Sequence, residues 1–173
     1  GEVKNLDGEY VSHPLAVWLS YGVAKCYTSK GDEISKVKFR EWNVLHNYLD
    51  KISQSLGNFK VICFVHNLGY EFDYVIKNVS LPINFLTNSS HSVIATTLVR
   101  YPNIQFRCSY LLSGYSLARI GKMINLPKLE SDYRQILPSQ KVTSQEWEYC
   151  ERDNDIVAKY IVDVCIKEYG LLF

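Results

Sequence analysis

The chain lacks the sequence signatures of secreted, membrane-spanning and zinc-stabilised proteins. It has no signal peptide and no run of about 18 apolar residues, which argues against secretion and against a membrane partner. Its five cysteines are an odd number and include no CxxC pair, so we expect reduced thiols rather than disulfides or a zinc framework. These absences predict a cytoplasmic protein.

A strong charge imbalance is also missing. The net charge is +1, so no overall basic field indicates a nucleic-acid partner, and any such site must be local. There is no low-complexity tract and no internal repeat. With 47% hydrophobic and 21% charged residues, the composition is typical of a globular protein. The length of 173 residues predicts a single domain over residues 1–173.

Apolar spacing predicts strands and helices in alternation. Spacings of three and four predict an amphipathic helix over Val37–Leu56, ended by Gly57. The continuous apolar run Lys60–Val65 is typical of a buried parallel strand. The other expected elements are one or two strands within 14–29, a helix over Leu68–Val79, a hairpin of Ser92–Val99 with Ile104–Tyr110, a helix over Tyr115–Ile124 and a helix from the Thr143 capping box to about Tyr169. This order predicts an α/β fold.

Two acids stand in the otherwise aromatic and apolar segment VICFVHNLGYEFDYVI, residues 61–76. Burying a carboxylate without a partner is costly, so Glu71 and Asp73 need an explanation. They follow the carboxyl end of a predicted strand, where α/β folds build their sites. Residues two apart on a helix face different ways, so at most one of the two acids is a ligand. The pattern alone leaves the choice open.

A second group of polar residues lies in WEYCERDNDIVAKYI, residues 147–161. Tyr149 and Asp153 are four apart, so they share one face of the predicted helix, beside its apolar stripe. The alternative is that Glu151, Asp153 and Asp155 form a solvated face. Lys128, in KLESDYRQI, is by itself compatible with an ordinary surface lysine.

Acids from separate elements, with a tyrosine and a lysine nearby, suit two-metal hydrolysis of a phosphodiester. Carboxylates are ligands for Mg²⁺ or Mn²⁺, and two such ions activate the attacking water and stabilise the leaving oxygen. A tyrosine can orient the water, and a lysine can offset negative charge on the phosphate.

Four segments in order, VHNLGYEF, FRCSYLLSGYSLARIG, KLESDY and EYCERD, resemble the 3′–5′ proofreading exonuclease domain of protein-primed family B DNA polymerases of bacteriophages. The resemblance runs from about Leu15 to Ile166. It implies a ribonuclease-H-like mixed sheet flanked by helices, hydrolysis at the 3′ end of single-stranded DNA, and a two-metal site for Mg²⁺ or Mn²⁺. The implied partners are that 3′ end, a polymerase domain of the same chain and a terminal priming protein.

The resemblance also implies roles for individual residues. Glu71 and Asp153 match metal ligands, Tyr149 matches the tyrosine that orients water, and Lys128 matches a lysine that assists catalysis. Aromatic groups in such a groove stack on unpaired bases without reading sequence. The positions that match contacts to the frayed 3′ end are His66, Asn67, Tyr70, Ser116, Leu117 and Tyr133.

The family's first motif, Asp-x-Glu on the opening strand, has no convincing match. Asp7-Gly8-Glu9 has the spacing, but Asp-Gly is a turn signal and no apolar run precedes it. We therefore expect the first motif and its strand upstream of Gly1, which makes the chain a fragment of a larger polymerase that binds single-stranded DNA but hydrolyses it poorly. No YxDTD-like polymerase motif occurs in the sequence.

Two other interpretations remain open. One is a catalytically silent domain of the same fold that binds single-stranded DNA, weakly and with help from the rest of a polymerase, as the near-neutral charge favours. The other is a structural protein whose acids are solvated and whose motifs match by chance.

Overall fold

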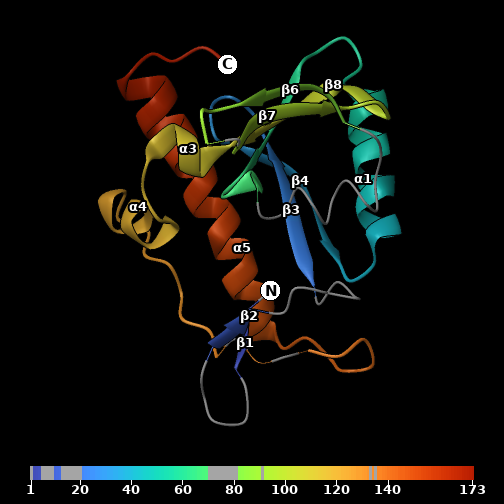
Figure 1. The fold of residues 1–173 in the computed structure, drawn as a ribbon, viewed down its shortest axis with the longest axis vertical. Coiled ribbons are helices and arrows are strands. Elements are labelled where there is room, and N and C mark those ends of the chain that lie inside the picture. The colour runs from blue at the N-terminus through green and yellow to red at the C-terminus, as the bar shows by residue number, and fades with distance from the viewer. Residues whose placement is uncertain are drawn as a thin grey trace.

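The computed structural model describes residues 2–4, 10–12, 21–69, 82–90, 92–132, 134 and 136–173. Its largest sheet has four strands in the order β5-β8-β7-β6. β5 and β8 run parallel, whereas the β8–β7 and β7–β6 pairs are antiparallel, so the sheet is mixed. The strands are β5 (Val61–Val65), β6 (Pro82–Thr87), β7 (Val93–Leu98) and β8 (Tyr101–Cys108). The fold is therefore a mixed α/β fold, as predicted (Figure 1).

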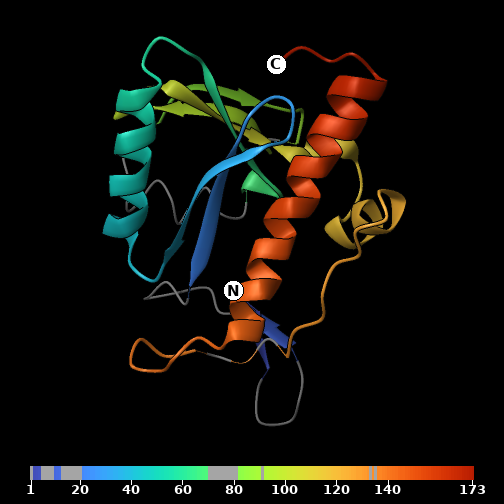
Figure 2. The same cartoon turned by 180° about the vertical axis from the view of Figure 1, so that it is seen from behind.

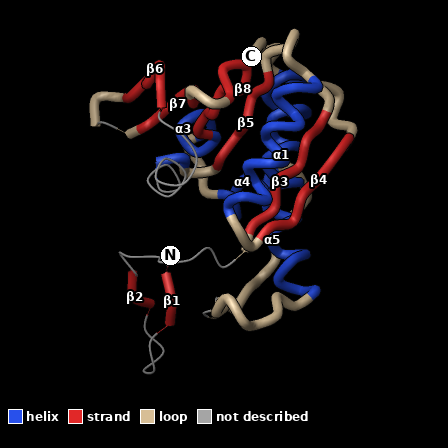
Figure 3. Tube along the Cα trace, turned by 90° about the vertical axis from the view of Figure 1, so that its right-hand side faces the viewer, coloured by secondary structure: helices blue, strands red, loops and turns tan. Residues whose placement is uncertain are grey.

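Two antiparallel strand pairs accompany this sheet. β3 (Gly22–Tyr27) pairs with β4 (Glu33–Phe39). β1 (Glu2–Lys4) pairs with β2 (Tyr10–Ser12), and this short pair lies apart from the other strands (Figure 3).

Helices cover both sides of the sheet. α1 (Trp42–Ser55) lies on one side, and α5 (Ser144–Lys159) runs along the other side, where it continues as the π-helix η1 (Tyr160–Glu168) (Figures 1 and 2). The short helices α3 (Ser109–Ser113) and α4 (Leu117–Met123) follow β8. Within the described part of the chain, no helix is long and apolar enough to cross a membrane.

Each side of the sheet has its own hydrophobic core. The core on the α1 side includes Leu49 of this helix and Phe106 of β8. The core on the α5 side includes Ile120 of α4 and Ile156 of α5, with Phe64 of β5 packed against it. Because successive side chains of a strand point to opposite faces, the apolar run of β5 serves both cores. This explains why its sequence shows no polar alternation.

Several predicted elements are confirmed. β5 is a parallel strand, β3 lies inside the strand segment 14–29, and β7 with β8 forms the predicted hairpin. Ser116 caps α4, and Thr143 caps α5, where its side chain accepts a hydrogen bond from the backbone N–H of Glu146. All five cysteines are free, and each is buried or partly buried.

The predicted helix over Val37–Leu56 begins too early, because α1 starts at Trp42 and residues 37–39 belong to β4. The strand was missed because most of its side chains are exposed and its alternation of polar and apolar residues is confined to residues 36–39. The structure also adds β6 and α3, which were not predicted, and it places Tyr110 in α3 rather than in a strand. Of the predicted helix over Leu68–Val79, residues 70–79 lie outside the described residues, as do Asp7, Gly8 and Glu9.

Candidate active site

Tyr149 and Asp153 lie on one face of α5, and Lys128 approaches that face from a separate segment of the chain. Lys128 Nζ lies 2.9 and 2.7 Å from the two carboxylate oxygens of Asp153. The same ammonium group donates to the Tyr149 hydroxyl at 2.5 Å and lies 4.1 Å from the centre of the tyrosine ring. Three residues from two separate sequence motifs thus form one cluster.

Lys128 is positioned by a sharp turn after α4. Asn125 adopts a left-handed conformation with φ 57°, and the Leu126 N–H donates to the carbonyl of Gly121 at 2.8 Å. A Cβ atom on Gly121 would lie 2.6 Å from the Leu126 carbonyl oxygen and 3.1 Å from the Lys128 nitrogen. Arg152 of α5 donates to the Pro127 carbonyl at 2.7 Å. The backbone next to Lys128 is therefore held by both α4 and α5.

The cluster is only partly open to solvent, and this affects its ionisation. The side chains of Lys128 and Asp153 are 21% and 28% exposed. Burial raises the pKa of Asp153, and the hydrogen bonds and charge of Lys128 offset only part of that effect. The carboxylate therefore still gains from additional positive charge close to it.

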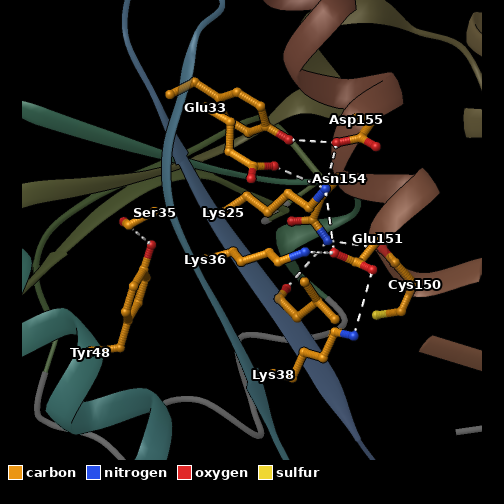
Figure 4. Close-up of polar contacts among 12 residues, drawn as sticks. Lys25, Glu33, Ser35, Lys36, Lys38, Tyr48, Cys150, Glu151, Asn154 and Asp155 are labelled. Atoms are coloured by element: carbon orange, nitrogen blue, oxygen red, sulfur yellow. Dashed lines mark hydrogen bonds and ion pairs between the residues drawn. The ribbon is translucent and has the colours of Figure 1, made fainter. Parts of the chain in front are cut away.

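α5 is fixed against the β3–β4 hairpin by charged contacts on its other face (Figure 4). Lys25 of β3, whose side chain is 6% exposed, lies 2.9 Å from Asp155, 3.1 Å from Glu33 and 3.6 Å from Glu151. The Tyr27 hydroxyl also donates to Asp155, at 2.8 Å. The alternative of a solvated acidic face is thus wrong for Glu151 and Asp155, because both acids pair with the hairpin.

His66 lies at the end of β5, beside the start of α3. Its Nδ1 atom is 3.1 Å from the Ser109 hydroxyl, and its ring meets the Tyr110 ring edge to face at 5.6 Å. Its Nε2 atom is buried and has no hydrogen-bond partner in the described structure. Burial lowers the pKa of His66 and the charge of Lys128 lowers it further, which favours the neutral imidazole, although a hydrogen bond with the Tyr115 backbone acts in the opposite direction.

The other residues predicted to contact DNA have different positions. Asn67 is exposed and adopts φ 68°, a left-handed conformation that asparagine tolerates. The Ser116 hydroxyl accepts from the Arg119 N–H as the cap of α4, and Leu117 packs against the core on the α5 side. The predicted residues Tyr70, Glu71 and Tyr133, and the alternative ligand Asp73, lie outside the described residues.

Sequence reasoning missed three residues near these groups. Ser109 and Tyr110 contact His66, although neither follows a recognisable spacing from it. Tyr21 lies edge to face with Trp147 of α5 at 5.4 Å. Burial, helped by the negative charges of Cys150, Glu146 and Asp153, raises the pKa of Tyr21 to about 12. Only long-range contacts identify these residues.

The expected metal site can be tested against the donors that are described. Among these residues, no three acids, histidines or cysteines lie close enough to form a metal cluster. Asp153 fits as a single ligand, because carboxylate oxygens are hard donors for Mg²⁺ or Mn²⁺. Lys128 offsets only part of the effect of burial on this carboxylate, so a cation close to it would stabilise its ionised form. Both of its oxygens accept from Lys128, so a metal ligand role requires that the lysine move aside or share the carboxylate.

No family model matches the chain, and no curated protein is similar to it in sequence. The fold, however, is similar to that of Phi29 DNA polymerase. In its complex with single-stranded DNA, that polymerase matches with a TM-score of 0.63 at 14% identity. The match covers 88% of this chain and 32% of the polymerase.

Two further structures of the same polymerase match in the same way. The complex with primer-template DNA gives a TM-score of 0.62 at 14% identity, and the orthorhombic crystal form gives 0.61 at 15% identity. The chain thus spans about a third of the length of the polymerase that it matches. The resemblance to a phage DNA polymerase that the sequence motifs indicated is confirmed as a likeness of fold.

Proposed function

We propose that the chain is a 3′–5′ exonuclease domain of a protein-primed DNA polymerase, with a ribonuclease-H-like fold. One observation carries the proposal. Lys128 Nζ reaches both Asp153 oxygens and the Tyr149 hydroxyl, so a lysine, a tyrosine and an acid that match three catalytic positions of this family lie together. The likeness of fold to Phi29 DNA polymerase supports the same family.

Each residue of the cluster has a role that follows from its chemistry. Asp153 would hold a divalent metal ion, Mg²⁺ or Mn²⁺, together with Glu71. The bound metal would supply a nucleophilic water at neutral pH and charge stabilisation at the phosphate. Tyr149 can accept or donate a hydrogen bond to position the attacking water. Lys128 would bring its positive charge beside the reacting phosphate.

Lys128 has a second role while no DNA is bound. Its ammonium group compensates the partly buried carboxylate of Asp153, which would otherwise be costly to keep ionised. A phosphate bound beside Asp153 would offer this ammonium group a second anion, toward which a flexible lysine side chain could turn. The same lysine thus holds the site ready and assists the reaction.

DNA is the proposed substrate, with single-stranded 3′ ends next to His66 and Asn67. The exposed Asn67 side chain and the 43% exposed Tyr110 ring, which His66 supports edge to face, offer polar and aromatic contacts that do not depend on base identity. A polymerase domain of the same chain, a terminal priming protein and a cytoplasmic location belong to this proposal as well.

A catalytically silent domain that binds single-stranded DNA is the second candidate. Its support is that Lys128 occupies both oxygens of Asp153, and that no acid cluster occurs among the described residues. The two candidates share the proposed contacts with DNA and differ only in hydrolysis.

Titration of Mn²⁺ into the chain with a 3′-labelled single-stranded oligonucleotide separates the two candidates. Both binding and release of mononucleotide are measured. Release that Asp153→Ala abolishes supports the exonuclease. Binding without release at any Mn²⁺ concentration supports the silent domain, and the absence of both contradicts the two candidates together.

A further inference from the structure

A cavity of about 500 Å³ opens over one face of the mixed sheet. Its floor is a row of three residues on adjacent strands: Arg107 of β8 pairs in register with Phe64 of β5 on one side and with Ala95 of β7 on the other. Residues that face each other across a ladder project to the same side of the sheet, so the three side chains share one face. None of Lys128, Tyr149 and Asp153 lines the cavity.

Arg107 is the charged group of this cavity, and it is partly buried. Its Nε–H donates to the Gln105 side-chain oxygen at 2.8 Å, and its guanidinium carbon lies 5.5 Å from the centre of the Phe173 ring. Among the described residues no carboxylate forms an ion pair with it, and burial lowers its pKa. A partly desolvated cation with no anionic partner among the described residues gains from an anion that binds beside it.

The remaining walls are mostly apolar, with a second polar group at one point. Leu86, Ile94, Leu111 and Leu112 line the cavity, and Leu86 and Leu112 are 56% and 40% exposed. The side-chain oxygen of Asn88 accepts three hydrogen bonds, from Ser90 N–H, Ser90 O–H and Ser92 N–H. The amide nitrogen of Asn88 is therefore the group that can donate a hydrogen bond to a ligand. A few polar groups on a mostly apolar concave surface are typical of small-molecule sites.

We propose that this cavity binds a nucleotide, with the phosphate on Arg107 and the base against the apolar walls. A guanidinium fork matches the geometry of phosphate oxygens, and two terminal nitrogens remain to donate once Nε is used by Gln105. The cavity volume lies within the range of about 300–1,000 Å³ typical of sites for molecules of this size. The ligand is either a free nucleoside monophosphate or one nucleotide of a DNA strand. This second site goes beyond the proposed exonuclease site and shares no residue with its cluster.

Phosphorus NMR of thymidine 5′-monophosphate, titrated with the chain in buffer that contains EDTA, tests the proposal directly. We expect a saturable change of the phosphorus signal. Arg107→Met should weaken binding by about tenfold or more, as expected for loss of a hydrogen-bonded charge. Arg119→Met is the matched control, because Arg119 also stacks on an aromatic ring, 4.2 Å from the centre of Tyr115, but is exposed and lies outside the cavity. It should bind as the unchanged chain does.

Further arms distinguish the ligand sources. If an oligothymidylate competes with thymidine 5′-monophosphate, the site takes a nucleotide of a DNA strand. If it does not compete, the site takes a free nucleotide. Arg107→Lys keeps the charge without the fork and should bind with intermediate affinity, which excludes misfolding as the cause of loss in Arg107→Met. Binding of inorganic phosphate as tight as that of the nucleotide, no saturable binding, or binding unchanged by Arg107→Met would overturn the proposal. Asp153→Asn should leave this binding intact, so failure of the exonuclease proposal is a separate result.

Discussion

Lys128 Nζ donates to both carboxylate oxygens of Asp153, at 2.9 and 2.7 Å, across 25 residues of sequence. Neither residue alone differs from a surface lysine or a surface acid. Together they form a partly buried ion pair. Burial raises the pKa of Asp153, and Lys128 offsets only part of that rise. This pair connects the motif after α4 to the motif on α5, and the first prediction depends on it.

Replacing Lys128 with methionine should raise the pKa of two other groups. Asp153 loses the only contributions that lower its pKa, while burial still raises it. His66 loses a positive charge that lowers its own pKa. A carboxylate with a higher pKa becomes protonated at a higher pH. Any metal-dependent activity that needs ionised Asp153 should therefore begin to fall, on acidification, at a higher pH than in the unchanged chain.

Carbon NMR of the Asp153 carboxyl group and proton NMR of the His66 ring measure both shifts. Lys122→Met is a suitable control, because Lys122 is exposed on α4 and contributes to neither pKa. A carboxyl pKa that stays the same or falls in Lys128→Met would mean that the lysine does not stabilise the ionised acid.

A methyl group at Gly121 should disturb the site through the backbone of Lys128. Its Cβ would lie 2.6 Å from the Leu126 carbonyl oxygen, a backbone atom that cannot rotate away. Overpacking of this kind costs about 1–3 kcal/mol. Gly57→Ala is the matched control, because its Cβ would meet its nearest neighbour, the Ser53 carbonyl oxygen, at an ordinary 3.4 Å.

Urea unfolding gives the stability of both glycine variants, and the carboxyl pKa of Asp153 shows whether the lysine has moved. We expect Gly121→Ala to lose stability and to shift that pKa upward, and Gly57→Ala to do neither. An unchanged pKa in a destabilised Gly121→Ala would show that the close packing matters for the fold but not for the position of Lys128.

Lys25 should contribute more to stability than an ordinary surface lysine. Burial acts to lower the pKa of Lys25, but hydrogen bonds to Asp155 and Glu33 raise it above its ordinary value. At pH values below its ordinary pKa, Lys25 is charged in both the folded and the unfolded chain. Its stabilising effect is therefore complete at neutral pH and is lost only as the pH rises through the pKa of the folded state. Because Glu33 and Asp155 are about 40% exposed and screened by water, we expect Lys25→Met to cost about 1–2 kcal/mol, less than breaking a fully buried pair.

Lys167→Met is the comparison for this measurement. Lys167 pairs with Asp163 at 3.4 Å, but both side chains are well exposed. Its loss should change the free energy of unfolding by less than about 0.5 kcal/mol. Equal effects of the two substitutions in urea unfolding at neutral pH would show that the contacts of Lys25 do not fix α5 to the hairpin.

Local patterns were enough to predict α5 and the common face of Tyr149 and Asp153 on it. Tyr149 and Asp153 are four apart, and the Thr143 cap sets where the helix begins, so their common face follows from helix geometry. The apolar run of β5 likewise placed His66 and Asn67 at the end of a strand. These predictions succeeded because each depends on contacts within a few residues.

The position of Lys128 could not be predicted in this way. It depends on the left-handed Asn125 and the close approach at Gly121, which are local, and on the contact of Pro127 with Arg152, 25 residues away. The strand β4 was missed for a related reason: it is held by pairing with β3, and most of its side chains face solvent. Long-range pairing leaves little trace in the local sequence.

The central claim is that Asp153 supports metal-dependent removal of 3′ nucleotides. The most direct measurement is the rate of mononucleotide release from a 3′-labelled single-stranded oligonucleotide in Mn²⁺, for Asp153→Asn and Asp163→Asn. Asp163 is the control because it too is an aspartate paired with a lysine, but it is 43% exposed on η1. We predict slow release that requires Mn²⁺, falls by about 100-fold or more in Asp153→Asn, and is unchanged in Asp163→Asn. Release that both variants retain equally would contradict the assignment of this site.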